Sequence, residues 1–246
     1  MRRILAIAAL FSLACGGGGE SGGGSDGGSA AAAAPLGTGS ITGVVNFAGT
    51  APANAAIDMS EEMECAAKYS DGPVDPVVVV NGGKLGNVFV RVTGGLPAGP
   101  YPMPSGAAQI DQDGCLYTPR VVGVMVGQDL EISNSDPLLH NIKSAPTENR
   151  PFNISQPRVM STSRTFATPE VMVPLQCDVH GWMKAFVGVT EHPYFAVSGA
   201  DGSFTISGLP DGTYTIEAWH ETLGTRTAEV TVSGGAAAAS EFSFGS

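Results

Sequence analysis

Four side chains of the kind that bind soft metal ions lie in two short stretches of the chain. Cys177, His180 and Met183 share the segment Cys-Asp-Val-His-Gly-Trp-Met, and His140 lies upstream of it. Sulfur ligands stabilise Cu(I), and imidazole also suits Cu(II), so this set is typical of an electron-transfer copper centre. A Cys-x2-His pair alone occurs by chance in many chains. A zinc site, or no metal site at all, is therefore the alternative.

The segments around these residues favour a metal site over a chance pairing. An apolar run at 171–175 precedes the Cys177 segment and another at 185–189 follows it, which predicts a strand, a tight loop and a strand. His140 follows a predicted strand at 130–133 and a polar turn that contains Asp136 and Pro137.

Two stretches, residues 124–141 and 177–183, resemble the cupredoxins, the family of small blue-copper proteins. The resemblance implies a Greek-key β-sandwich that carries single electrons. It implies one type 1 copper ion and four ligands, which are His140, Cys177, His180 and Met183, with Met183 in the axial position.

The same resemblance assigns roles to the neighbours of the ligands. Asn141 is expected to tie the two ligand loops together, although Asp178 stands where relatives often carry Ser or Thr, which puts that hydrogen bond in question. His180 is expected at the surface as the electron port. Trp182 beside it would enlarge an apolar docking patch there, and a core position for Trp182 is the alternative.

Strand-like runs recur through the chain and no segment has a sustained helical period, so the sequence predicts an all-β fold. Residues 194–219 resemble the carboxypeptidase regulatory-like (transthyretin-like) β-sandwich module, and residues 40–47 resemble its first strand. We expect a cupredoxin domain at 76–190 that includes strands at 77–80 and 88–92, and a polar loop at 144–162. The second, smaller sandwich is expected at 191–246. The lead-in at 39–75 can belong to that module, in which case the copper domain is inserted into it.

The first residues resemble a bacterial lipoprotein signal. Residues 1–14 combine Arg2 and Arg3 with an apolar run too short to span a bilayer, and Cys15 follows as the expected lipidated N-terminus. Residues 15–38 are mostly Gly, Ser and Ala and predict a flexible linker. These features predict a lipid-anchored protein of the cell envelope that faces the periplasm or the exterior, and they favour the outer membrane. Ordinary secretion with cleavage elsewhere is the alternative.

The other cysteines have a simple assignment. With Cys15 reserved for lipid and Cys177 for copper, Cys65 and Cys115 remain, and an oxidising envelope favours a disulfide between them. Two free thiols or a second metal site are the alternatives.

The charge balance limits the possible partners. A net charge of −11 excludes a basic nucleic-acid-binding face, so the expected partners are redox proteins as electron donor and acceptor, and the membrane through the N-terminal lipid. Only His192 and His220 remain beyond the two candidate ligands, too few for a multicopper enzyme, and we expect no enzymatic activity. The leading hypothesis is a type 1 copper electron carrier. The alternative is a non-redox copper-binding or scaffold lipoprotein.

Overall fold

A computed structural model describes residues 33–245 of the chain. The predicted signal peptide, the lipidation site Cys15 and most of the predicted linker lie outside the described residues. Within them the chain folds into strands and one four-residue helix, α1 (Met63–Ala66), which confirms the prediction of an all-β fold. No helix in this range has the length and the apolar character needed to cross a bilayer.

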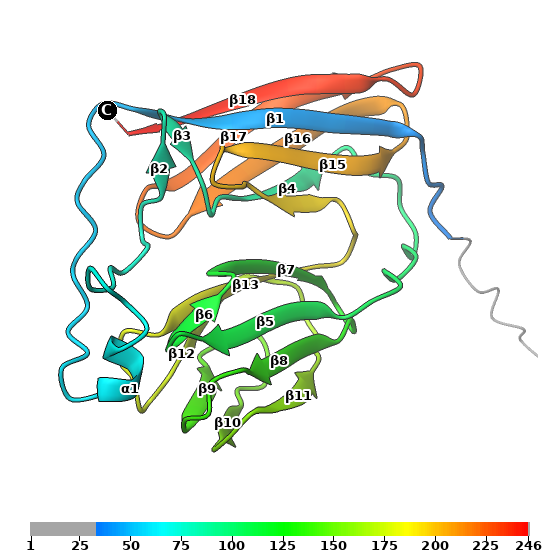
Figure 1. The fold of residues 1–246 in the computed structure, drawn as a ribbon. Coiled ribbons are helices and arrows are strands. Elements are labelled where there is room, and N and C mark those ends of the chain that lie inside the picture. The colour runs from blue at the N-terminus through cyan, green and yellow to red at the C-terminus, as the bar shows by residue number, and fades with distance from the viewer. Residues whose placement is uncertain (1–32, 246) are drawn as a thin grey trace, which may run out of the picture. The chain divides into compact units, whose positions relative to one another are not determined.

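The two ends of the described chain build one β-sandwich, here called the terminal sandwich (Figure 1). One sheet has the order β15-β1-β3-β2, with β18 also paired to β1, and the other has the order β14-β4-β16-β17. β1 runs antiparallel to β15 and parallel to β18. The strands are β1 (Gly39–Ala48), β2 (Val80–Asn81), β3 (Lys84–Leu85), β4 (Phe89–Gly94), β14 (Phe195–Val197), β15 (Ser203–Leu209), β16 (Gly212–His220), β17 (Gly224–Val232) and β18 (Ala237–Gly245).

The middle of the chain builds a second sandwich, the central sandwich. Its sheets have the orders β10-β9-β12-β13-β7 and β11-β8-β5-β6. The strands are β5 (Ala108–Asp113), β6 (Leu116–Thr118), β7 (Val121–Met125), β8 (Leu130–Asn134), β9 (His140–Ser144), β10 (Asn153–Gln156), β11 (Met160–Arg164), β12 (Glu170–Gln176) and β13 (Lys184–Thr190).

Alternating burial explains why these segments are strands. In β16 the side chains of Tyr214, Ile216 and Ala218 point into the terminal core, while Thr213 and Thr215, at alternate positions, are exposed. In β8, Leu130 and Ile132 are fully buried in the central core, with half-buried residues between them. Successive side chains of a strand point to opposite faces, so each strand offers one apolar face to its core.

The predicted start of the copper domain at residue 76 is wrong. Strands β2 to β4 pair with strands of the terminal sandwich, β4 lying between β14 and β16. Val88, Val90 and Val92 are buried in the terminal core. An alternating apolar run satisfies the inner face of either sandwich equally well, so its period does not reveal which sandwich it joins. The central sandwich therefore begins at β5.

The predicted polar loop at 144–162 is also partly wrong, because β10 and the start of β11 lie in it. β11 carries the polar run Ser161, Thr162 and Ser163 and pairs antiparallel with β8 at the edge of its sheet. An edge strand that is mostly exposed needs no apolar face, and it therefore gives no hydrophobic pattern in the sequence.

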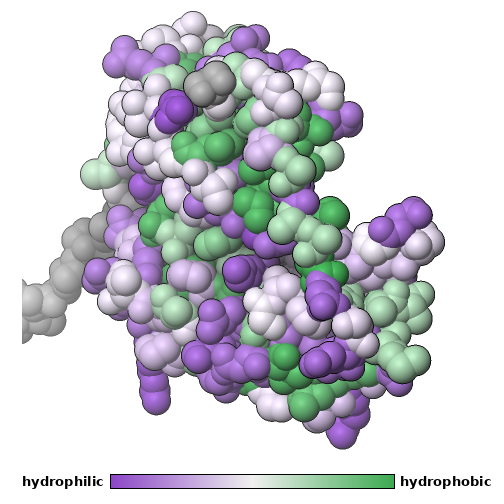
Figure 2. Space-filling view, turned by 90° about the vertical axis from the view of Figure 1, so that its left-hand side faces the viewer, coloured by the Kyte–Doolittle hydropathy of each residue, from purple (hydrophilic) through white to green (hydrophobic). Residues whose placement is uncertain are grey.

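Residues 49–75, here called the strap, run from the end of β1 along the side of both sandwiches to α1 and return to β2 (Figure 1). Figure 2 views this side of the molecule, where hydrophilic and hydrophobic residues are interspersed. A disulfide joins Cys65 of α1 to Cys115, with 5.7 Å between the Cα atoms, which confirms the predicted pairing. Tyr69 Oη also donates a hydrogen bond of 2.7 Å to the Gly114 carbonyl. The strap is therefore attached to the central sandwich.

Aromatic side chains of the terminal sandwich pack into notches on the central sandwich. A Cβ atom added to Gly188 of β13 would lie 2.5 Å from Phe89 Cζ, and one added to Gly123 of β7 would lie 2.3 Å from Phe195 Cε2. The two phenyl rings contact each other, with centroids 5.7 Å apart. The glycines thus make room for the rings at the junction of the two sandwiches.

This packing predicts that Gly188→Ala lowers the free energy of unfolding by about 1–3 kcal/mol, because the fully buried ring of Phe89 has nowhere to move. Denaturant titration of the metal-free protein measures the effect. Gly106→Ala is the matched control, since no atom lies within 4 Å of its added Cβ. Equal stability of the two variants would contradict the account of the junction.

Two further histidines are partly or fully enclosed near the terminal core. His220 is 1% exposed and its Nε2 has no hydrogen-bond partner, while His192 lies 3.1 Å from the Val92 carbonyl through Nε2. Burial lowers the pKa of both imidazoles. Burial therefore disfavours the charged form of both residues in the folded chain.

The contribution of His192 and His220 to the free energy of unfolding is therefore expected to fall on acidification. Because the folded-state pKa values are below the unfolded value of about 6.5, stability is complete above that pH and is lost as the pH falls toward the folded pKa. The slope of the free energy of unfolding against pH is at most about 1.4 kcal/mol per pH unit for each histidine. Unfolding of the metal-free protein at several pH values, compared with His220→Gln, measures it. An identical slope in the variant would exclude a contribution from His220.

Candidate metal centre

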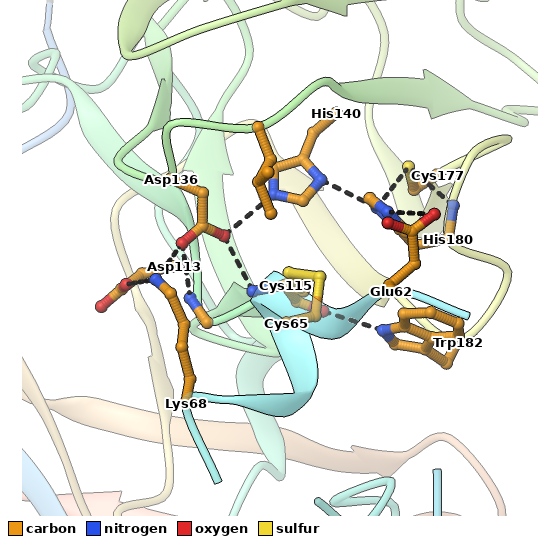
Figure 3. The surroundings of a disulfide bond; sticks show 12 residues. Glu62, Cys65, Lys68, Asp113, Cys115, Asp136, His140, Cys177, His180 and Trp182 are labelled. Carbon is orange, nitrogen blue, oxygen red and sulfur yellow. Dashed lines mark hydrogen bonds and ion pairs between the residues drawn. A yellow bond between two sulfur atoms is a disulfide. The ribbon is translucent and has the colours of Figure 1, made fainter. Parts of the chain in front are cut away.

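Three of the four predicted ligands converge at one end of the central sandwich. His140 begins β9, and Cys177 and His180 lie in the loop between β12 and β13. One nitrogen of each imidazole and the Cys177 sulfur all lie within 4.8 Å of one another. The two Nδ1 atoms are 2.9 Å apart, and His180 Nδ1 is 3.9 Å from Cys177 Sγ (Figure 3).

The ligand loop is closed by its own backbone. The Cys177 N–H donates to the Met183 carbonyl at 3.2 Å, and the Met183 N–H donates to the His180 carbonyl at 2.9 Å. The His180 N–H points at Cys177 Sγ at 3.3 Å. Met183 is fully buried and belongs to the same core cluster as Cys177. The loop thus holds Cys177 and Met183 in the central core cluster and buries His180.

Asn141 ties the two ligand loops together, as the resemblance implied. Its Oδ1 accepts a hydrogen bond of 2.6 Å from the Asp178 N–H and lies 3.3 Å from Cys177 Sγ. The bond uses the backbone of Asp178, so it does not depend on a Ser or Thr there. The Asp178 carboxylate is exposed and contacts Lys143 and Asn153 instead. Tyr117 Oη donates to the Asn141 carbonyl at 2.6 Å and fixes the same residue from the other sheet.

Loss of this tie is expected to loosen the metal site. Asn141→Ala leaves the Asp178 N–H without its acceptor and removes the amide beside the sulfur. We expect a loss of metal affinity of about 10- to 100-fold, the usual range for partners of metal ligands. Asn54→Ala is the matched control, because Asn54 also makes two hydrogen bonds to one backbone residue, Val78, far from the ligands in the chain. A competition titration with a copper chelator measures both, and equal affinities would refute the role.

The charge state of the thiol also suits a metal ligand. Burial acts to raise the pKa of the Cys177 thiol, but hydrogen bonds from His140 and from backbone N–H groups outweigh it, and the pKa is lowered. Burial lowers the pKa of His180, and the nearby His140 lowers it further. The thiolate of Cys177 and the neutral imidazole of His180 are the forms that bind metals.

His180 is not at the surface, so the predicted exposed electron port is wrong. Its side chain is 2% exposed, and Glu62 of the strap lies 3.8 Å from its Nε2. Trp182 covers it from another side, with the ring centroids 5.2 Å apart. The resemblance covers the two ligand stretches and carries no information about the strap, which is why it misplaced this residue.

Trp182 is also not the open docking patch that was predicted. It is half-buried, donates a hydrogen bond of 2.9 Å to the Cys115 carbonyl, and packs against the disulfide cluster of Met59, Cys65 and Cys115. Together with Glu62 and Val179 it lines a hollow of about 220 Å³ on the surface. The indole therefore belongs to the cover of the site, with one edge facing this hollow.

Sequence reasoning missed Asp136 as part of the site. Its carboxylate is fully buried, and Oδ2 lies 2.9 Å from His140 Nε2, the ring nitrogen that faces away from Cys177 (Figure 3). The spacing of four residues between Asp136 and His140 was the available signal, but the segment was interpreted only as a polar turn. Cys115, Asp136 and His140 also lie close enough to form a second metal group, but the Cys115 sulfur is in the disulfide and is not a thiolate.

The donor set fits copper. Two imidazole nitrogens and one thiolate sulfur face one another in a buried space, which is the combination of ligands that serves both oxidation states of copper. His140 Nε2 is engaged by a carboxylate, which leaves Nδ1 for the metal. Met183 adds a buried thioether in the same cluster.

No protein-family model matches the chain, and no curated protein sequence matches it either. Among solved structures it is similar to a purple cupredoxin from Nitrosopumilus maritimus, with a TM-score of 0.30 and 22% identity over 34% of this chain and 99% of that one. A Cu(I) form of a mutant amicyanin has a TM-score of 0.32 and 19% identity over 35% of this chain and 85% of that one. A copper-containing nitrite reductase from Thermus scotoductus SA-01 has a TM-score of 0.32 and 19% identity over 49% of this chain and 29% of that one. These TM-scores are too low to assign a ligand or an activity, so the ligand assignment depends on the side-chain geometry.

Proposed function

We propose that the chain is a type 1 copper electron-transfer protein of the bacterial cell envelope that carries single electrons between redox proteins. The single observation that supports this most is the convergence of two Nδ1 atoms and one thiol sulfur from loops far apart in the sequence. Copper, when bound, would supply the one-electron exchange between Cu(I) and Cu(II). His140, Cys177 and His180 would hold it, with Met183 as a fourth ligand.

The rest of the site would keep the ligands in place during electron transfer. Asn141 and the backbone of the ligand loop fix Cys177, and Asp136 fixes the His140 ring. A site whose ligands are held by the fold changes little between oxidation states, so little energy is spent on rearrangement. The buried surroundings exclude water from the thiolate.

Electrons would leave the site near Trp182. His180 contacts the Trp182 ring, and Trp182 reaches the hollow on the surface. An acidic chain suits a partner with a basic docking face, and such association weakens as salt is added. Two further parts of the proposal come from the sequence: the N-terminal lipid would anchor the protein to a membrane, and the terminal sandwich would be a non-catalytic support.

An absorption and EPR spectrum of the copper-loaded chain tests the proposal, followed by cycles of oxidation and reduction. We expect an intense thiolate-to-Cu(II) absorption that is bleached by one electron per chain and returns on oxidation. A colourless Cu(II) complex in a chain with an intact Cys177 thiol would refute the proposal.

A second candidate function is copper binding without electron transfer, as in a storage or scaffold protein. The observation that favours it is the burial of both histidines, which are 0% and 2% exposed. The rate of electron self-exchange between reduced and oxidised protein separates the two. Fast exchange supports the carrier, whereas a site that binds copper but exchanges electrons only very slowly supports storage.

A further inference from the structure

The buried carboxylate of Asp136 connects the candidate copper site to the strap. Its Oδ2 contacts His140 Nε2 at 2.9 Å and also accepts the Cys115 N–H at 2.8 Å. Its Oδ1 accepts the Gly114 N–H at 3.1 Å and is paired with Lys68 Nζ (Figure 3). The Asp136 side chain is completely buried, so these partners replace water as its surroundings.

The orientation of the carboxylate is fixed by the fold. The Asp136 N–H donates to Asn134 Oδ1 at 3.0 Å, and Asn134 Nδ2 in turn donates to the Leu138 carbonyl at 2.9 Å, inside the loop that leads to His140. The two backbone donors belong to the turn that carries one half of the disulfide. The carboxylate therefore cannot rotate away from His140 without breaking several hydrogen bonds.

Within residues 33–245, the lysine that pairs directly with the negative charge of Asp136 is Lys68. Lys68 comes from the strap, directly after α1, and its side chain is 34% exposed. It also contacts Asp113, at 3.4 Å, but the Asp113 side chain is 67% exposed and does not touch a candidate ligand. The strap thus places a positive charge one carboxylate away from the imidazole of His140.

We propose that Asp136 is a positioning residue for the copper site whose negative charge lowers the reduction potential of the bound metal, and that Lys68 of the strap partly offsets this effect. The inference rests on the proposed function. Asp136 accepts a hydrogen bond from the Nε2–H of His140 and so keeps the Nδ1 lone pair directed at the metal. A buried anion behind a ligand favours the more positively charged state, Cu(II), over Cu(I).

The charges of the two residues lead to opposite expectations. Asp136→Asn removes the anion while keeping the shape of the side chain, so it should make the potential more positive. Lys68→Met removes the cation and leaves Asp136 uncompensated, so it should make the potential more negative. If the residues only supported the fold, their loss would not produce shifts of opposite sign.

The first test is the reduction potential of the copper-loaded chain and of these two variants. We expect each variant to change the Cu(I)/Cu(II) affinity ratio by about tenfold, which is about 59 mV for a one-electron couple. Asp113→Asn is the matched control, because it also removes a carboxylate from Lys68 but none from His140, and its potential should stay close to that of the unaltered chain. Shifts of the same sign, or no shift in either variant, would overturn the proposal.

The second test needs no copper. Nitrogen-15 NMR of the metal-free chain, at a pH where the His140 ring is neutral, reports which ring nitrogen carries the proton. We expect the proton on Nε2 in the unaltered chain and in Lys68→Met, and a mixture of the two tautomers in Asp136→Asn. A proton on Nδ1 in the unaltered chain would overturn the positioning role. Failure of the chain to bind copper would instead refute the proposed function and would leave this test of Asp136 intact.

Discussion

Replacing both Cys65 and Cys115 by serine is expected to lower the free energy of unfolding by about 4 kcal/mol and to uncover His180. The two cysteines are 50 residues apart, and a cross-link over a loop of that length restricts the unfolded chain by about this amount. The same bond attaches α1 to the central sandwich next to Trp182. Without it, the strap keeps the apolar packing of Met59 and the polar contacts of Lys68 and Tyr69.

Denaturant unfolding measures the first effect, and modification of His180 by a histidine-specific reagent in the metal-free chain measures the second. The double variant should be modified much faster than the unaltered chain. His220, which is buried elsewhere, serves as the internal control and should keep its rate in the folded state. A double variant of unchanged stability, with His180 still protected, would show that the strap does not depend on the disulfide.

The second large effect is expected from Cys177→Ser. A serine hydroxyl is a hard donor and is not ionised at neutral pH, so soft Cu(I) loses its sulfur ligand. The intense absorption should disappear because no thiolate remains to transfer charge to Cu(II). Removal of a residue that is hydrogen-bonded to a metal ligand usually lowers metal affinity by about 10- to 100-fold, and the loss of Cu(I) affinity in Cys177→Ser should be larger.

Met183→Leu is the matched variant for this experiment, since it removes the other sulfur of the ligand loop while filling the same buried space. It should retain the absorption with altered position or intensity, because the thioether is neutral and a weaker ligand. If Cys177→Ser keeps both the colour and the affinity, the thiolate does not bind the metal. If Met183→Leu loses the absorption as Cys177→Ser does, the thioether of Met183 is not the weaker ligand that we propose.

The grouping of His140, Cys177 and His180 was predictable from the residue types and the strand pattern around each of them. Cys177, His180 and Met183 lie within one loop between two apolar runs, and a strand followed by a polar turn leads to His140. The disulfide was predictable from the cysteine count and an oxidising compartment. The first inference needed residue type and the pattern around each ligand, and the second needed only the number of cysteines and the redox state of the compartment.

The cover of the site was not predictable in this way. The strap has no periodic pattern, and the residues that it brings to the site, Glu62 and Lys68, are surface-type side chains far from the ligands in the chain. Nothing in their sequence neighbourhood indicates what they face. Burial of His180 depends on this long-range placement, which is why the predicted exposed port was wrong.

The assignment of strands to sandwiches failed for a related reason. Val88 to Val92 alternates as a strand must, but the choice between two sandwiches depends on pairing with β14 and β16, whose residues lie about a hundred positions later. The notches at Gly188 and Gly123 likewise depend on residues far away in the chain, because they receive Phe89 and Phe195. A glycine in a strand indicates a close approach but not which side chain approaches.

The central claim is that Cys177, His140 and His180 bind one copper ion through Sγ and two Nδ1 atoms. X-ray absorption at the copper edge of the Cu(I)-loaded chain tests it most directly, because it identifies the atoms bound to the metal. We expect one short copper–sulfur contact and two imidazole nitrogens per copper, with the sulfur lost in Cys177→Ser. A coordination shell of nitrogen and oxygen alone, unchanged in that variant, would contradict the account.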